Sequence, residues 1–252
     1  MVNSAIQALG GALFPTRCCL CQWSCAGTLP LCDDCRAELV SNQQCCQQCA
    51  VPLATGVAVC GDCLSRPPHY DRVIAPWLYG EYLAYIIGRW KFHGDRALTP
   101  LLANLWHCGL PSSLPTVDLL VPVPLHWRRQ WHRGYNQADL LATQLLNMYP
   151  WLMANRQLLR RRHATKAQAG MDAQQRSSNL SGAFTVSSGC DNLRVALIDD
   201  VLTTGATAGE AARALKQAGA ARVEIWCLAR TPPPEKYYLE WFVHLHFCWF
   251  YL

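Results

Sequence analysis

The chain has 252 residues with a formal net charge of +5, and 51% of the residues are hydrophobic. This length is enough for one sizeable core with a small satellite domain, or for one large α/β domain. The longest apolar stretches fall short of a membrane span, and the first residues lack the basic region of a secretion signal. We therefore expect no membrane insertion and a cytoplasmic protein.

The charge is unevenly distributed along the chain. Residues 1–65 carry a net charge of −2, residues 66–180 carry +8, and the remaining residues carry −1. Because cationic surfaces attract anionic ligands, the middle segment is where an anionic ligand is expected.

The first 65 residues contain two copies of a cysteine pattern with the spacing Cys-x2-Cys-x10-Cys-x2-Cys. The first copy is Cys18, Cys21, Cys32 and Cys35, and the second, 28 residues later, is Cys46, Cys49, Cys60 and Cys63. Two thiolates two residues apart can face one ion, and two such turns complete a tetrahedral Zn²⁺ site. The pattern predicts a double zinc ribbon with two structural Zn²⁺ ions, whereas a disulfide framework is typical of secreted chains.

The predicted zinc ribbons are poor phosphate binders. Each Zn²⁺ offsets only two of its four thiolate charges, so each site keeps about −2 in an already acidic segment. This favours a protein-docking or stabilising module over contact with DNA, although contact with DNA stays open.

Strand and helix patterns alternate after residue 65. Buried strands are predicted at 118–124, in a run from 195 that ends at Asp199 and Asp200, and at 221–230; helices are predicted at 135–149 and 207–220. Alternation at this spacing predicts an α/β fold with a parallel sheet covered by helices. Ligands of such sheets bind at the carboxyl ends of the strands.

The stretch "VALIDDVLTTGAT", residues 195–207, combines two carboxylates with a loop at a predicted helix start. The loop residues are Thr203, Thr204, Gly205, Ala206 and Thr207. Glycine permits the bend, while N–H groups and hydroxyls at a helix N-terminus can hold a phosphate. Asp199 and Asp200 can accept hydrogen bonds from two vicinal hydroxyls, so a 5-phosphorylated ribose is predicted. The plainer alternative is an ordinary helix cap.

Two other segments are less specific. Residues 156–179 are rich in arginine and could form a lid over a ligand, an edge of a groove for a nucleic-acid backbone, or a solvated loop. Residues 232–252 begin with prolines and continue with many aromatic residues, which indicates an atypical tail. The expected division is a double zinc ribbon at 1–65, an α/β domain at 66–231 and this tail.

The 195–207 stretch closely resembles the phosphoribosyl pyrophosphate (PRPP) motif of type I phosphoribosyltransferases. Together with the double zinc ribbon, it resembles the ComF/GntX family, which is associated with competence and DNA utilisation in bacteria. Further stretches agree with this family: "KFHGD" at 91–95, "VPVPLHWRRQWHRGYNQ" at 121–137, "RRHATKAQAG" at 161–170 and "RSSNLSGAF" at 176–184. The resemblance covers residues 13–231.

The resemblance implies a type I phosphoribosyltransferase-like domain that binds PRPP together with Mg²⁺. Asp199 and Asp200 would contact the ribose hydroxyls, and Thr203 to Thr207 the 5-phosphate. Arg128, Arg129 and Arg133 would contact the pyrophosphate, their alternative being solvated surface charge. Mg²⁺ would use waters and substrate oxygens as ligands.

Two classes of function follow from this resemblance. One is an enzyme that transfers the phosphoribosyl group to an acceptor, with pyrophosphate leaving. The other is a catalytically inactive accessory protein that binds single-stranded DNA or a protein of the competence machinery. The acceptor and the catalytic residues are not assigned by any stretch of the sequence.

Overall fold

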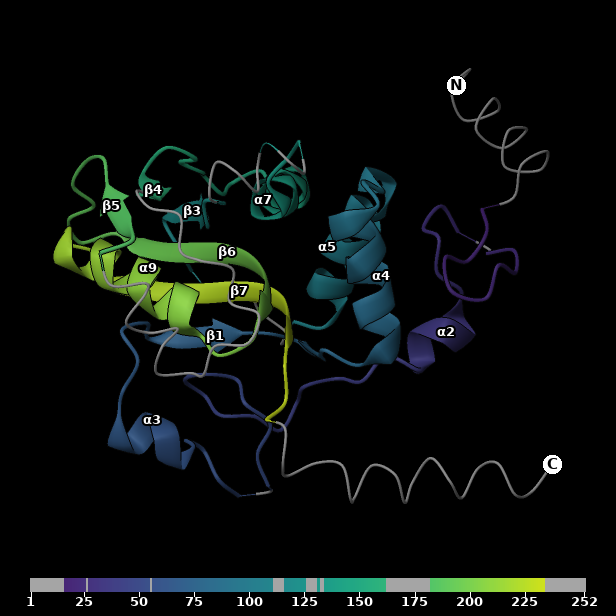
Figure 1. Ribbon diagram of the computed structural model, residues 1–252, viewed down its shortest axis with the longest axis horizontal. Coiled ribbons are helices and arrows are strands. Elements are labelled where there is room, and N and C mark those ends of the chain that lie inside the picture. Colours follow the sequence, from purple (N-terminus) through teal and green to yellow (C-terminus); the bar gives the residue numbers. More distant parts are fainter. Residues whose placement is uncertain are drawn as a thin grey trace.

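The computed structural model of the protein describes residues 16–25, 27–54, 56–110, 116–125, 131, 134–161 and 182–233. Two small cysteine-rich ribbons precede a larger α/β part, and they lie on different sides of it (Figure 1). Among the described residues, no helix is both long enough and apolar enough to cross a membrane.

A parallel sheet forms the centre of the larger part. Its five strands are β1 (Arg72–Ile74), β2 (Trp77–Leu78), β3 (Leu119–Pro122), β6 (Arg194–Leu202) and β7 (Arg222–Arg230). The strand order is β1-β7-β6-β3, and β2 pairs with β7 farther along the same edge as β1. Every pairing in this sheet is parallel. The predicted α/β fold with a parallel sheet is confirmed.

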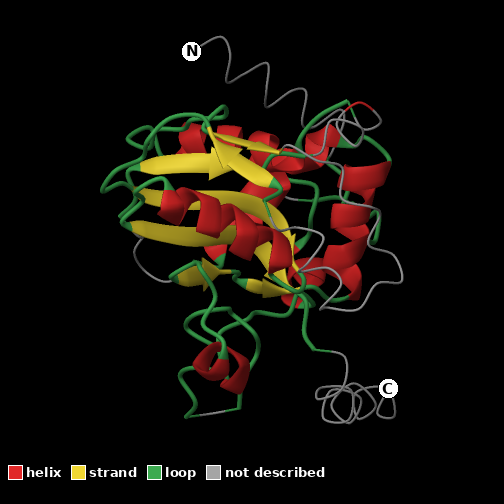
Figure 2. Ribbon diagram, turned by 60° about the vertical axis from the view of Figure 1, so that its left-hand side comes forward, coloured by secondary structure: helices red, strands yellow, loops and turns green. Residues whose placement is uncertain are grey.

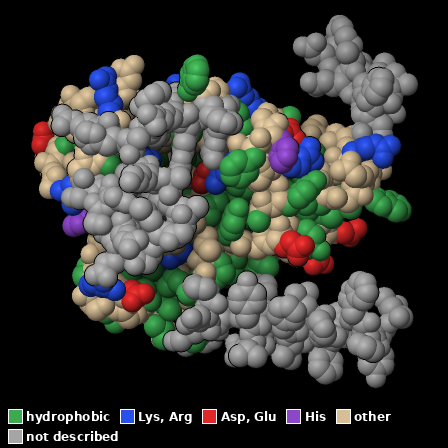
Figure 3. Space-filling model, viewed as in Figure 1, with side chains coloured by type: hydrophobic (Ala, Val, Ile, Leu, Met, Phe, Trp, Pro, Cys, Tyr) green, Lys and Arg blue, Asp and Glu red, His purple; other side chains and the backbone are tan. Residues whose placement is uncertain are grey.

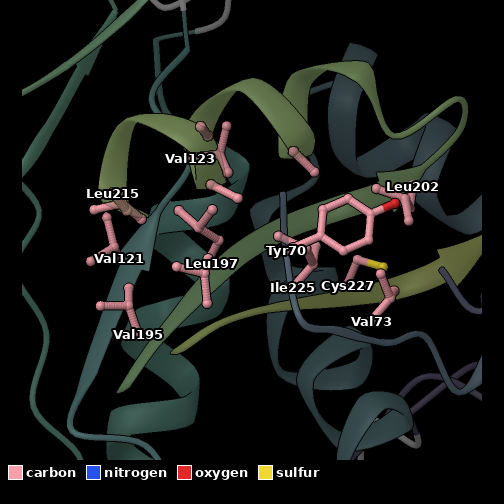
Figure 4. Packing of buried hydrophobic residues seen from close by; sticks show 14 of the residues in the cluster. Tyr70, Val73, Val121, Val123, Val195, Leu197, Leu202, Leu215, Ile225 and Cys227 are labelled. Atoms are coloured by element: carbon pink, nitrogen blue, oxygen red, sulfur yellow. The ribbon is translucent and has the colours of Figure 1, made fainter. Parts of the chain in front are cut away.

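Helices cover both faces of the sheet (Figures 1 and 2). Helix α9 (Ala206–Gln217) lies on one face, and α4 (Glu81–Phe92), α5 (Thr99–Cys108) and α7 (Gln137–Met148) lie on the other. Successive side chains of a strand point to opposite faces. In β6, Val195 and Leu197 accordingly pack in the core under α9, as Figure 4 shows, whereas Ala196 and Ile198 pack under the other helices.

Smaller elements complete the described part. Strands β4 (Leu159–Arg161) and β5 (Phe184–Val186) form an antiparallel pair, and the short helix η1 (Arg96–Leu98) connects α4 to α5. The side chain of Asn136 caps α7 by accepting a hydrogen bond from the backbone N–H of Ala138, at 3.1 Å.

Two element bounds differ from the predicted ones near the 195–207 stretch. Strand β6 continues through both aspartates to Leu202, because the long neighbour β7 pairs with it as far as the Leu202–Arg230 position. Helix α9 ends at Gln217 instead of continuing to residue 220, because Gly219 has a left-handed φ of +98° that cannot continue the helix.

The two ribbons pack against different cores. Each contains a five-residue helix that starts directly after a cysteine: α2 (Asp33–Ala37) after Cys32 and α3 (Gly61–Ser65) after Cys60. The first ribbon contributes Cys19 and Leu39 to the core under α4 and α5. The second contributes all four of its repeat cysteines to the core under α9. The second ribbon is therefore part of the hydrophobic core, although the three-part division predicted from the sequence stays a prediction.

Candidate functional site

Asp199 and Asp200 lie in the second half of β6, toward the carboxyl end of the sheet, and both are partly buried. One oxygen of each carboxylate is used locally. The backbone N–H of Asp200 donates to Asp199 Oδ1 at 2.8 Å, and that of Val201 donates to Asp200 Oδ1 at 2.6 Å. These bonds fix both side chains at the mouth of the predicted loop.

A lysine of α4 forms an ion pair with one of the two carboxylates. Lys91 Nζ lies 2.8 Å from Asp200 Oδ2, and the two side chains are only 15% and 17% exposed. Burial, followed by the charge of Asp200, raises the pKa of Asp199 to about 7. The raised pKa brings the titration of Asp199 close to neutral pH.

The loop after β6 has the backbone shape that the sequence requires. Gly205 has a φ of +77° and precedes the first residue of α9, so the turn uses the left-handed region. A Cβ at this position would lie 3.0 Å from the hydroxyl of Tyr70. Thr203 and Thr204 are exposed, and the N-terminus of α9 adds the positive end of a helix dipole. The loop is thus an exposed turn at the positive end of a helix, the kind of position that favours an anion.

A cavity of about 260 Å³ lies in front of the aspartates and the loop. Its lining includes Asp199, Asp200, Thr203 and Thr207, so the structure brings both halves of the predicted site together. The polar residues that the sequence reasoning did not assign to the site are Tyr79, Lys91, Asn136, Gln137 and Arg161. Four of these five lie in the stretches "KFHGD", "WHRGYNQ" and "RRHATKAQAG". These stretches resemble the family but had been given no role, and that resemblance could have indicated their place in the site.

The predicted pyrophosphate arginines Arg128, Arg129 and Arg133 lie outside the described residues. The cavity lining includes Leu125 and Asn136, which lie on either side of these arginines in the sequence. Most of the arginine-rich segment 156–179 and of the tail 232–252 also lie outside the description.

The two cysteine sets have the geometry of metal sites. Within each predicted set of four, all sulfurs lie within 4.8 Å of one another. The sulfurs of Cys21 and Cys32 are 3.6 Å apart, as are those of Cys49 and Cys60. Tetrahedral zinc with bonds of about 2.3 Å places neighbouring sulfurs about 3.8 Å apart. These residues therefore form two Cys₄ zinc-binding sites, as predicted.

Backbone hydrogen bonds prepare the first cysteine of each set as a thiolate. Burial raises the pKa of the Cys18 thiol, but N–H groups of the following turn and of Cys32 outweigh it and lower the pKa to about 6. The same balance lowers the pKa of Cys46 to about 7, and the N–H of Cys60 lies 3.4 Å from its sulfur. Thiolates are the form that binds Zn²⁺.

The first zinc site is more exposed and lies in acidic surroundings. Its ligands include the exposed Cys21, whereas all four ligands of the second site are buried. Figure 3 shows acidic side chains gathered near α2, the helix of the first ribbon.

Comparison with known proteins agrees with this arrangement. Residues 9–64 match the family model of the double zinc ribbon domain. The chain is 33% identical over 223 residues to a protein named DNA utilization protein YhgH from Escherichia coli K12, covering 86% of this chain and 98% of the relative. It is 35% identical over 208 residues to Competence protein F of Haemophilus influenzae, covering 79% and 90%. It is 28% identical over 212 residues to Competence protein ComFC of Bacillus subtilis, covering 80% and 84%.

Solved structures of phosphoribosyltransferases are also similar, at low scores. A glutamine PRPP amidotransferase from Bacillus subtilis has a TM-score of 0.36 and 15% identity, covering 52% of this chain and 26% of that one. A purine phosphoribosyltransferase from Pyrococcus horikoshii has a TM-score of 0.30 and 16% identity, covering 58% and 73%. Scores this low carry no argument about the site. The identity to full-length relatives shows the family: the chain belongs to the ComF/GntX family.

Proposed function

We propose that the protein binds the ribose 5-phosphate part of PRPP, as its Mg²⁺ complex, at the carboxyl edge of the sheet. The observation that carries this proposal is one cavity lined by two adjacent carboxylates and by the threonines of a left-handed turn at a helix N-terminus. Its volume of about 260 Å³ is close to the lower end of the roughly 300–1,000 Å³ range of small-molecule sites.

The charges in the cavity suit the two ends of such a ligand. The 5-phosphate would receive N–H and hydroxyl donors of residues 203–207, at the positive end of α9. The ribose hydroxyls would donate to the aspartate oxygens that accept no backbone hydrogen bond, displacing Lys91 from Asp200 Oδ2. Lys91 and Arg161, both in the lining, supply positive charge for the remaining phosphate groups.

The proposal also assigns ligands to the pyrophosphate group of PRPP and to Mg²⁺. Arg128, Arg129 and Arg133 lie in the sequence between the lining residues Leu125 and Asn136, and they remain the proposed pyrophosphate ligands. Mg²⁺ neutralises part of the diphosphate charge when it is bound, with waters and substrate oxygens as its usual ligands.

Isothermal titration calorimetry with Mg²⁺–PRPP tests the proposal. The wild-type protein should bind. The double variant Asp199→Asn/Asp200→Asn should lose binding, because a neutral amide oxygen accepts a hydrogen bond from a ribose hydroxyl less strongly than a carboxylate does, and the amide NH₂ group cannot accept one. Asp118→Asn is the matched control, since Asp118 pairs with Arg194 at the amino end of the same sheet. Equal heats for the double variant and the control would reject ribose recognition by these carboxylates.

The cellular role that we propose is in DNA uptake or utilisation, as the names of the relatives suggest. An enzymatic role would break the bond between the anomeric carbon and the pyrophosphate oxygen, so release of pyrophosphate from Mg²⁺–PRPP is its readout. Incubation of PRPP with purine bases, pyrimidine bases or single-stranded DNA as acceptors would reveal it.

A second candidate function is binding of single-stranded DNA, and the net charge of +8 on residues 66–180 favours it. Affinity for an oligonucleotide should fall steeply as salt rises, because bound cations are released from the phosphates. A protein of the competence machinery is the other proposed partner, and the acidic first ribbon is the better candidate for that contact.

A further inference from the structure

One arginine joins the second zinc ribbon to the loop of the candidate site. Arg230 ends β7, next to the carboxyl end of β6. Its Nε donates to the carbonyl of Cys49, a ligand of the second zinc site, at 3.1 Å. Its Nη1 donates to the carbonyl of Leu202 at 3.0 Å and to the carbonyl of Thr203. The guanidinium thus binds the zinc turn on one side and the start of the phosphate loop on the other.

A buried tyrosine makes a second connection between the same two places. Tyr70 packs in the core that contains the four cysteines of the second zinc site together with Leu202. Figure 4 shows its ring beside Leu202 and Cys227. The hydroxyl of Tyr70 closes the space next to Gly205, the residue that turns the loop into α9. The loop therefore rests on packing that includes the zinc site.

The first ribbon is attached elsewhere. Arg89 of α4 donates to the carbonyl of Cys19 at 3.4 Å and to Asp95 at 2.6 Å. The hydrophobic residues of the first ribbon pack in the core on the face of the sheet opposite to α9. The two zinc sites, which have identical spacing in the sequence, thus differ in what they contact.

We propose that Arg230 is a positioning residue that couples the second zinc site to the phosphate loop. Its planar fork holds the carbonyls of Leu202 and Thr203 in place, and this orients the N–H groups of the following turn before a ligand arrives. Because coupling between two sites is reciprocal, an anion bound in the loop stabilises zinc retention at the second site, and zinc there strengthens anion binding. The anion half of this proposal rests on the proposed function, whereas the zinc half does not.

The first experiment uses the unaltered zinc-loaded protein. A chelator is added with N-ethylmaleimide, and mass spectrometry follows alkylation of each zinc-binding cysteine with and without saturating ribose 5-phosphate. The expected result is slower alkylation of the second set, on the order of tenfold, with the first set unchanged. The coupling would be overturned if calorimetry shows the ligand to be bound and the ligand slows alkylation of both cysteine sets equally, or of neither.

The second experiment needs no ligand. Arg230→Gln and Arg230→Lys are compared with Arg194→Gln, which removes another multiply bonded arginine from the opposite end of the sheet. Hydrogen exchange of residues 199–207 and alkylation of the second cysteine set should both accelerate in the two Arg230 variants. The first cysteine set serves as an internal control for global unfolding, and it should change no more than in Arg194→Gln.

Comparison of Arg230→Gln with Arg230→Lys distinguishes a positioning role of the guanidinium from an effect of its positive charge alone. A lysine keeps the positive charge near the thiolates but cannot bind the zinc turn and the loop carbonyls with one planar group. Wild-type behaviour of Arg230→Lys would overturn the positioning role. If the wild-type protein binds no ribose phosphate while the Arg230 variants still loosen the loop and the second zinc site, the proposed ligand fails and the positioning role stands.

Discussion

Asp199 should titrate near neutral pH, and its neighbours Lys91 and Asp200 should move this titration in opposite directions. The pKa of its carboxyl is raised from 3.8 to about 7, first by burial and then by the charge of Asp200, while Lys91 lowers it. A pKa shift of one unit corresponds to about 1.4 kcal/mol, so folding disfavours the ionised form of Asp199 by about 4 kcal/mol relative to its ionisation in the unfolded chain. The perturbations are Lys91→Met and Asp200→Asn.

Removing each neighbour removes one known cause of the shift. Lys91→Met should raise the midpoint by about 1 pH unit, and Asp200→Asn should lower it by a similar amount. The assay is ¹³C NMR of aspartate-labelled protein between pH 5.5 and 8.5, with the Asp199 signal assigned by its absence in Asp199→Asn. A wild-type midpoint below pH 5, or shifts of the same sign in both variants, would refute the reasoning.

The sign of the linked stability effect follows from the raised pKa. The folded protein binds this proton more tightly than the unfolded chain, so the contribution of Asp199 is most favourable below about pH 4. It is lost as the pH rises toward 7. Ligand binding has the opposite dependence, because the ionised carboxylate is the better acceptor for a ribose hydroxyl. Affinity should therefore increase as the pH rises through 7, and Asp199→Asn should remove that increase.

Three further predictions concern the loop, the zinc sites and the tail. Gly205→Ala should cost about 1–2 kcal/mol of stability in urea unfolding, because alanine resists the left-handed region, and it should weaken ribose 5-phosphate binding in calorimetry. Unchanged unfolding would contradict the observed turn. Cys46→Ser should lower the thermal midpoint more than Cys21→Ser, because Cys46 is buried in the core under α9 and Cys21 is exposed. Ending the chain after Thr231 should leave folding and ligand binding intact, and loss of soluble protein on expression would contradict this.

Local patterns were sufficient to predict the zinc sites and the loop. The cysteine spacing fixes four sulfurs around one ion with little help from the rest of the fold, so Cys18 and Cys46 could be assigned to separate sites. The turn at Gly205 was likewise predictable, because a glycine directly before a helix start marks a left-handed turn in the local sequence. Its support by Tyr70 and Arg230 was not. Features whose physics is contained in a short stretch can be predicted from that stretch.

Contacts between distant parts of the chain could not be predicted in the same way. The pairing of Lys91 with Asp200 depends on where the end of α4 lies relative to β6, which no local pattern gives. The extension of β6 beyond Ile198 depends on the length of its neighbour β7. Arg230 was part of a predicted strand, and nothing in that strand indicates that its side chain reaches the carbonyl of Cys49.

The difference between the two ribbons shows where the sequence repeat stops being informative. Equal spacing implies equal coordination, and the 3.6 Å sulfur separations agree in the two sites. The two sites differ in burial, however, because only the second site shares a core with Leu202 and Tyr70 beneath the loop that precedes α9. A structural metal that is built into the support of a binding loop contributes to the order of that loop as well as to folding. If the loop before α9 binds the proposed ligand, the second zinc site has that position. Loss of its zinc should then disorder the carboxyl edge of the sheet, whereas loss of the first zinc should mainly affect the surface around α2.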